Sequence, residues 1–151
     1  MTGLGPFFPE DIRRDHAVRH MTPGRVLYLV CDFTKPPKEK FIVLAAPDDP
    51  PLLLVVNSSI PPFISAKPHL ATCQVALVAS DHAFLDHDSF VNCSEVIDSM
   101  SSSNLLDQLV ADPARIRGEV SAPARSRIVE AVRKARTISP LHKGRILAAL
   151  P

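Results

Sequence analysis

The chain has 151 residues, 46% of them hydrophobic, which fits one domain with a single core. No run of residues reaches the roughly 18 apolar positions of a membrane helix, and the N-terminal segment lacks the basic and apolar regions of a signal peptide, so we expect a cytoplasmic protein that does not associate with membranes. The formal net charge of +1 averages over an uneven distribution, because residues 115–151 carry nine Lys or Arg and two Glu. Such a basic segment either binds phosphate or an acidic partner, or it covers the acidic part of its own domain, or it is a solvated helix face.

The composition also argues against several kinds of chemistry. Cys31, Cys73 and Cys93 are an odd number without a C-x-x-C pair, so we expect buried free thiols and neither a disulfide framework nor a structural zinc site. There is no G-x-G-x-x-G, P-loop or G-x-S-x-G sequence, and we expect no cofactor. Seven Phe, one Tyr and no Trp predict at most a thin aromatic platform for stacking bases, although Phe63 and Phe84 lie in predicted loops.

The predicted elements begin with an arm and a β domain. Residues 1–24 are broken by Gly and Pro and form an N-terminal arm with one short helix over residues 10–20. Residues 25–138 form the predicted domain. Its first five strands are expected over residues 25–33, 41–46, 52–57, 72–80 and 89–97. The connections between them are rich in Pro and too short for several crossover helices, so we expect a mostly antiparallel, strongly bent barrel.

After the fifth strand, the hydrophobic period changes from that of strands to that of helices. The remaining elements are a Ser/Asn-capped helix over residues 101–112, a strand over 116–121, an amphipathic helix over 122–136 and a short helix over 140–150. We expect the amphipathic helix to pack on the barrel. The last helix, capped by Ser139, lies in a C-terminal extension over residues 139–151.

Polar residues gather at the ends of the predicted strands, where packing does not require them. They are Asn57, Ser58, Ser59, His82, His87, Asp88 and Ser89. On a β scaffold such a group indicates a binding or catalytic site. The alternative for each His is a surface residue or a core imidazole bonded to a neighbouring carbonyl. Residues 81–88 also offer imidazoles and carboxylates, but they lack a spaced metal-binding signature, so we expect a turn and no metal site.

The order of elements over residues 23–137 is informative. A strand and a basic loop precede a strand ending in VLAA and a strand ending in NSS; SFVNCSEVID follows, and IRGEVS leads into the amphipathic helix. This order resembles the MazF/PemK family of toxin ribonucleases. The resemblance implies a mainly β fold, a small SH3-like antiparallel barrel with a C-terminal amphipathic helix and short flanking helices. It also implies metal-independent cleavage of single-stranded RNA, a homodimer, and a cognate antitoxin that blocks the RNA groove.

The resemblance also assigns places to individual residues. Lys40 is nearest to the basic residue near the start of the family's second strand, and Ser58 or Ser59 is nearest to the residue that lines the RNA site. One branch of the family has an Arg and an Asp that serve in acid and base roles. This chain has Asn92 and Ser94 there, and neither transfers a proton at neutral pH.

Metal-free RNA cleavage needs a base, an acid and a donor for the charge on the phosphoryl oxygens. We expect His87 or His82 to act as base or acid, with Asp88 orienting the ring and Lys40 stabilising charge. The expected substrate-binding residues are Asn57, Ser58, Ser59, His82, Ser89, Asn92 and Ser94. The alternative function is a catalytically silent module that binds a protein partner or RNA.

Overall fold

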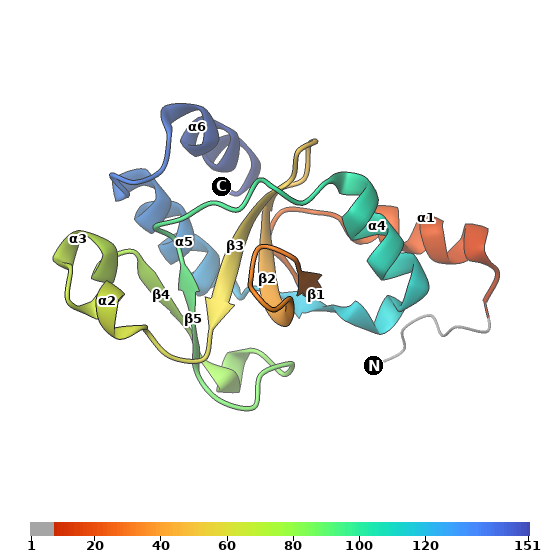
Figure 1. The fold of residues 1–151 in the computed structure, drawn as a ribbon, viewed down its shortest axis with the longest axis horizontal. Coiled ribbons are helices and arrows are strands. Elements are labelled where there is room, and N and C mark those ends of the chain that lie inside the picture. The colour runs from red at the N-terminus through yellow and green to blue at the C-terminus, as the bar shows by residue number, and fades with distance from the viewer. Residues whose placement is uncertain (1–7) are drawn as a thin grey trace.

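The computed structural model describes residues 8–151, so the first seven residues of the predicted arm lie outside the described residues. Six strands form one antiparallel sheet in the order β4-β5-β3-β2-β1-β6 (Figure 1). The strands are β1 (Arg25–Cys31), β2 (Lys38–Ala46), β3 (Leu52–Asn57), β4 (Gln74–Leu77), β5 (Ser89–Asn92) and β6 (Ile116–Glu119). All six were predicted, although β1, β4, β5 and β6 are shorter than expected, and β2 begins three residues earlier.

Within residues 8–151, six helices accompany the sheet. They are α1 (Glu10–His20), α2 (Pro62–Ser65), α3 (Pro68–Ala71), α4 (Ser102–Ala111), α5 (Ala122–Lys134) and α6 (Pro140–Ala149), with short 3-10 turns at Ala79–Asp81 and Pro113–Arg115. The sequence predicted α1, α4, α5 and α6. It missed α2 and α3, because a helix of four residues is too short to show a hydrophobic period.

The sheet curls where β3 changes partners. Up to Val55, β3 pairs with β2, whereas Val56 and Asn57 pair with β5. Register shifts in the β1–β6 and β2–β3 pairs add to the bend, because an extra residue in one strand increases local twist. Among residues 8–151, the edge strands β4 and β6 do not pair with each other. The predicted antiparallel, strongly bent sheet is therefore confirmed, as half of a barrel within a mixed α/β fold.

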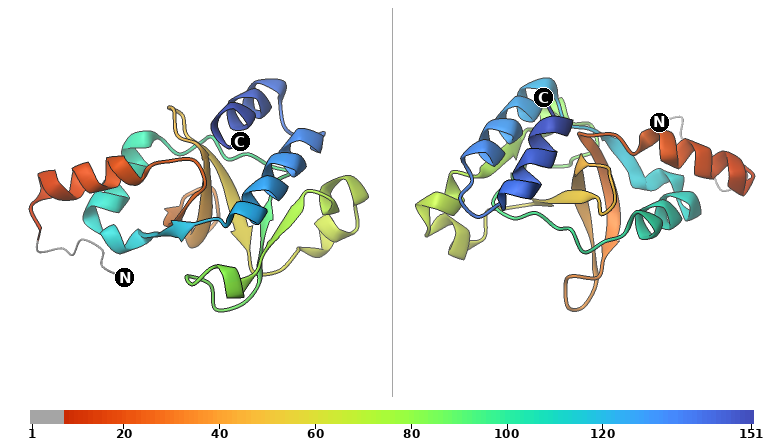
Figure 2. Two further views of the ribbon diagram at one scale, coloured as in Figure 1. Left: turned by 180° about the vertical axis from the view of Figure 1, so that it is seen from behind. Right: turned by 90° about the horizontal axis from the view of Figure 1, so that it is seen from above.

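Alternation along the strands places an apolar core on each face of the sheet. Val43 and Leu54 belong to one core, which includes residues of α5 and α6, and Ile42 and Leu53 belong to the other, which includes residues of α1 and α4. The right-hand view of Figure 2 shows α5 and α6 on one side of the sheet and α1 and α4 on the other. The sheet is consequently covered on both faces, and its open region lies at one end.

Serine caps fix where the longer C-terminal helices begin. Ser101, Ser121 and Ser139 each accept a hydrogen bond through Oγ from the backbone N–H three residues later, at 3.1, 3.3 and 3.2 Å respectively. Each bond satisfies an N–H that has no partner within its helix. The caps of α4 and α6 were predicted from sequence. No helix within residues 8–151 is both long and apolar enough to cross a bilayer.

Candidate functional site

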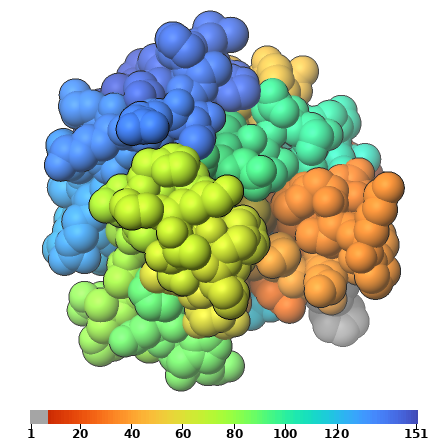
Figure 3. All heavy atoms as spheres, turned by 60° about the vertical axis from the view of Figure 1, so that its left-hand side comes forward, coloured from red at the N-terminus to blue at the C-terminus, as the bar shows by residue number. Residues whose placement is uncertain are grey.

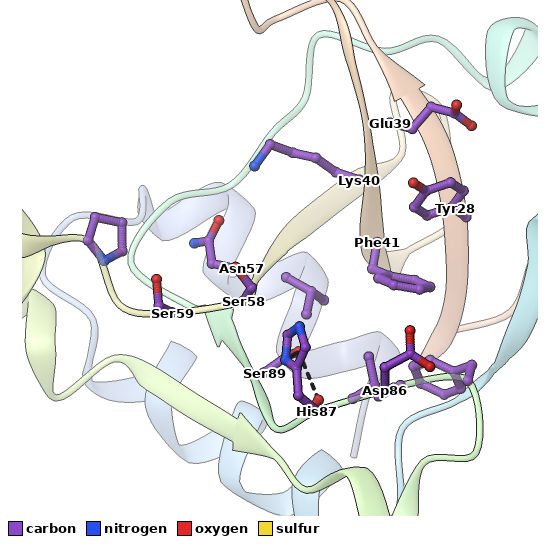
Figure 4. Close-up of a pocket in the computed structure, with 14 residues that line it drawn as sticks. Tyr28, Glu39, Lys40, Phe41, Asn57, Ser58, Ser59, Asp86, His87 and Ser89 are labelled. Atoms are coloured by element: carbon purple, nitrogen blue, oxygen red, sulfur yellow. Dashed lines mark hydrogen bonds between the residues drawn. The ribbon is translucent and has the colours of Figure 1, made fainter.

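A cavity of about 420 Å³ opens at the end of β3 (Figure 4). We call it the site cavity. Its lining contains six of the ten predicted site residues, namely Lys40, Asn57, Ser58, Ser59, His87 and Ser89. They come from three separate parts of the chain: β2, the end of β3, and the loop that leads into β5. The space-filling view in Figure 3 shows the turn before β2, in orange, and the segment that follows β3, in yellow-green, on the same face of the molecule.

The register of the central strands explains how Lys40 reaches Asn57. The last pair between β2 and β3 is Ile42 with Val55, and Lys40 and Asn57 each lie two residues beyond it. A spacing of two residues keeps both side chains on the same face of the sheet. Figure 4 shows the Lys40 side chain extending toward Asn57, and Ser58 and Ser59 follow on the chain. A cation, an amide and two hydroxyls therefore share one part of the site cavity.

His87 is oriented by its own loop. Its Nδ1 lies 2.9 Å from the carbonyl oxygen of Asp88 and 3.5 Å from Oγ of Ser89. A carbonyl only accepts, so this contact assigns the ring proton to Nδ1, which donates to Asp88. Within residues 8–151, Nε2 has no hydrogen-bond partner, and its lone pair is free to accept a proton. Figure 4 shows the ring directed from the loop toward the end of β3.

His82 and Asp88 hold the loop instead of lining the site cavity. His82 is 2% exposed; its Nδ1 donates to Val78 O at 2.8 Å, and its Nε2 accepts from Ser121 N–H at 3.0 Å. It therefore corresponds to the core-imidazole alternative. The Asp88 carboxylate accepts from Ala79 N–H at 2.8 Å. The main-chain carbonyl of Asp88, and not its carboxylate, therefore orients His87. The carboxylate instead joins the two ends of the loop through its bond to Ala79.

Asn92 and Ser94 also lie outside the site cavity. Oδ1 of Asn92 accepts from Ser94 N–H at 3.1 Å, from Ser94 Oγ at 2.5 Å and from Gln74 Nε2 at 2.9 Å. These bonds form a turn at the end of β5, which explains why the predicted strand over residues 89–97 ends early. Both residues line a different cavity, of about 470 Å³, beside α2 and the start of α6.

The sequence analysis missed an aromatic group in the lining of the site cavity. Tyr28 and Phe41 are opposite each other in the β1–β2 pair, with ring centroids 4.9 Å apart, and Phe84 lies 5.8 Å from Phe41. The low number of Tyr and Trp residues in the sequence did not reveal this group, because only three aromatic rings from distant positions in the chain form it. The local sequence held no signal for it, because the strand register that places Tyr28 opposite Phe41 is set by the pairing of β1 with β2. Glu39 and Asp86 also line the site cavity and were not among the predicted site residues.

Several basic residues of the C-terminal segment form ion pairs or hydrogen bonds within the domain. Arg115 forms an ion pair with Glu39 at 2.9 Å. Arg125 donates to the carbonyls of Leu150 and Pro23, and Arg145 donates to those of Asp48 and Pro50. Arg115 therefore fits the alternative in which the basic segment covers the acidic part of its own domain, whereas Arg125 and Arg145 bond main-chain carbonyls.

The three cysteines are buried free thiols, as predicted. Burial raises the pKa of Cys31 to about 11, and it also raises the pKa of Cys73 and of Cys93. A thiol attacks only as the thiolate, so none of them is activated as a nucleophile. Within the described part of the chain, no three His, Cys, Asp or Glu side chains come together as a candidate metal site.

Comparison with known proteins gave no match to this chain, either among family models or among curated sequences. What defines the molecule is therefore its own geometry: a curled antiparallel sheet between two helical layers, with a polar and aromatic cavity at the end of β3.

Proposed function

We propose that the site cavity binds single-stranded RNA and that Lys40 and His87 cleave it without a metal ion. The observation that supports this proposal is the convergence on one cavity of a cation, a histidine whose Nε2 has no partner among the described residues, and three small polar side chains. Residues of these types supply the base, the charge stabilisation and the phosphate contacts that the reaction requires.

The chemistry follows from the positions of Lys40 and His87. In Figure 4 they enter from opposite sides, with Asn57 and Ser58 between them. His87 Nε2 accepts the 2′-hydroxyl proton, and the 2′-oxygen attacks the adjacent phosphorus. The P–O5′ bond breaks; Lys40 stabilises the charge on the phosphoryl oxygens and donates a proton to the leaving 5′-oxygen. The products are a 2′,3′-cyclic phosphate and a 5′-hydroxyl, and both side chains regain their starting state by exchange with water.

The remaining residues position the substrate in this proposal. Asn57, Ser58 and Ser59 donate hydrogen bonds to the phosphate or to base edges, and Ser89 supports the His87 ring. The resemblance to the MazF/PemK family leads us to propose three further properties: an SH3-like barrel, a homodimer, and a cytoplasmic antitoxin partner that covers the site cavity.

The test is incubation of the purified chain with labelled single-stranded RNA in excess EDTA. We expect cleavage by the wild type and a loss of about 100-fold or more in His87→Ala, because general acid–base catalysis contributes about that much. Lys40→Ala should lower the rate as well. His69→Ala and Lys67→Ala are matched controls, since both residues are exposed and lie outside the site cavity. Cleavage that His87→Ala and Lys40→Ala leave unchanged would falsify the assignment.

A specific observation favours the alternative of a catalytically silent binding module. The positions equivalent to one acid–base pair of the resembled family are Asn92 and Ser94, and here they only form a turn. Absence of cleavage by the wild type, together with RNA or protein binding that Lys40→Ala weakens, would establish this second function. Expression in cells separates the two as well, because a toxin stops growth and a binding module does not.

A further inference from the structure

The aromatic wall of the site cavity is the strongest feature that the proposed chemistry does not use. We call Tyr28, Phe41 and Phe84 the aromatic ledge. The three rings are half-buried, they line the site cavity, and they follow one another at centroid distances of 4.9 and 5.8 Å. Phe41 and Phe84 pack against the core with one part of each ring and keep the other part accessible, unlike the fully buried neighbours Leu27 and Ile42. The ledge therefore offers aromatic surface to something outside the protein.

An arginine extends the aromatic ledge. The Arg117 guanidinium carbon lies 4.9 Å from the Tyr28 ring centroid and 5.9 Å from that of Phe41. The residue is exposed, and within residues 8–151 its side chain forms no ion pair or hydrogen bond. A guanidinium held over an aromatic ring presents a second planar surface, and RNA bases stack on both kinds of surface.

The ledge is held rigidly by its neighbours. A Cβ at Gly118 would lie 3.0 Å from Cδ1 of Phe84, so the absence of a side chain there lets Phe84 pack closely against β6. The buried His82 ring contacts Phe84 at 5.6 Å between centroids. A rigid surface loses little conformational entropy when a ligand binds it.

Charge divides the site cavity into two halves. Lys40 and the serines after β3 lie on one side, whereas Asp86 lies with Phe41 and Tyr28 on the other (Figure 4). A carboxylate repels phosphate, so the side with the aromatic ledge suits the uncharged, planar part of a nucleotide. The carboxylate also accepts hydrogen bonds from N–H groups on a base edge.

We propose that the aromatic ledge and Arg117 bind one nucleobase of the substrate by stacking, and that Asp86 selects guanine. Guanine presents two adjacent donors, N1–H and N2–H, which a carboxylate accepts together, whereas uracil presents one donor between two carbonyls. This inference rests on the proposed RNA substrate and adds the place where a base is recognised. Arg117 is a substrate-binding residue in this account and takes no part in proton transfer.

The experiment uses the fact that Tyr28 is the only tyrosine in the chain. Protein labelled with ¹³C at tyrosine gives the ring signals of a single residue, and a base stacked nearby shifts them upfield. The probes are guanosine 5′-monophosphate, uridine 5′-monophosphate and ribose 5-phosphate, which has no base. We expect the largest shift and the tightest binding with the guanine nucleotide, and no shift with ribose 5-phosphate.

Two variants and a control sharpen the result. Arg117→Gln should weaken binding of the guanine nucleotide at least about 5-fold, the lower limit for one stacking contact. Asp86→Asn should remove the difference between the guanine and uracil nucleotides. Arg127→Gln, an exposed arginine on α5, should bind like the wild type. Equal shifts with ribose 5-phosphate, or no shift with any probe, would overturn the proposal.

The outcome is separable from that of the cleavage assay. A guanine-dependent shift in a protein that does not cleave RNA would support the base site and refute the ribonuclease. Cleavage without any base-dependent shift would refute the base site and leave the ribonuclease in place.

Discussion

At the scale of single residues, His82 and His87 show how the same side chain takes two roles within one loop. Both have Nδ1 bonded to a main-chain carbonyl. The difference lies in Nε2, which accepts from Ser121 N–H in His82 and has no hydrogen-bond partner among residues 8–151 in His87. Burial and one backbone donor therefore decide which imidazole is available for chemistry.

His82→Ala should destabilise the fold by about 2–4 kcal/mol, since it creates a cavity and leaves the Ser121 N–H without its partner. Urea unfolding followed by circular dichroism measures the change. His69→Ala is the matched control and should stay within about 0.5 kcal/mol of the wild type, because that side chain is exposed. Equal effects from both substitutions would contradict the structural role of His82.

The thiols give a prediction with a defined pH window. The pKa of Cys31 rises from an ordinary 9.0 to about 11 on folding, because burial disfavours the thiolate. The folded state therefore keeps a proton that the unfolded state releases, and this contribution to stability is complete below pH 9 and lost as the pH rises toward 11. We expect the urea midpoint to fall across that window in the wild type and to fall less in Cys31→Ala.

The reactivity of the thiols gives a second test. Ellman's reagent at pH 8 should react slowly with the native protein and quickly with all three thiols in denaturant. Fast reaction of native Cys31 would contradict the raised pKa of its thiol.

At the scale of elements, local side-chain hydrogen bonds set where strands and helices begin and end. The Asn92 side chain turns the chain after β5, and serine caps start α4, α5 and α6. Lys143 contributes at the other end of α5, where its Nζ donates to the carbonyls of Arg133 and Ala135. A cation at the end of a helix also stabilises the helix dipole. Helix α6 therefore supports α5 through side-chain contacts as well as through the shared core.

Two substitutions in α6 should change stability in opposite directions. Ser139→Ala removes the cap and should cost about 1 kcal/mol. Gly144→Ala should gain about 0.5–1 kcal/mol, because this exposed helical glycine has no atom within 4 Å of an added Cβ. Thermal unfolding of the two single variants measures both effects. A loss of stability in Gly144→Ala would show that the helix is strained at this position.

At the scale of the whole molecule, the sheet joins two cores that lie on its opposite faces. Ile146 of α6 is fully buried in one core, and Leu109 of α4 is fully buried in the other. Because the same strands contribute alternate side chains to both cores, loss of either should weaken the entire sheet. The helices near the two ends of the described chain, α1 and α6, contribute buried residues to these cores, Ala17 and Ile146.

Ile146→Ala and Leu109→Ala should each cost about 2–5 kcal/mol, and unfolding should remain one cooperative transition in both variants. Circular dichroism and Tyr28 fluorescence should give coincident urea curves. A midpoint that Ile146→Ala leaves unchanged would show that residues 139–151 are an independent extension.

The sequence by itself determined the elements and their order. The hydrophobic period, Pro-rich connections and serine caps placed all six strands and four of the six helices, because these signals are local. The same reasoning found polar strand ends at Asn57 to Ser59 and at His87, since buried strands leave polar residues conspicuous.

Only the tertiary structure decided which residues share a cavity. Lys40, Asn57 and His87 meet because β3 changes partners at its end, a property of strand pairing that the local pattern does not contain. Pairing of β1 with β2 brings Tyr28 beside Phe41, while burial removes His82 from the site. Such outcomes depend on contacts between residues far apart in the chain, and their free energy is set by packing and hydrogen bonds formed only in the folded state.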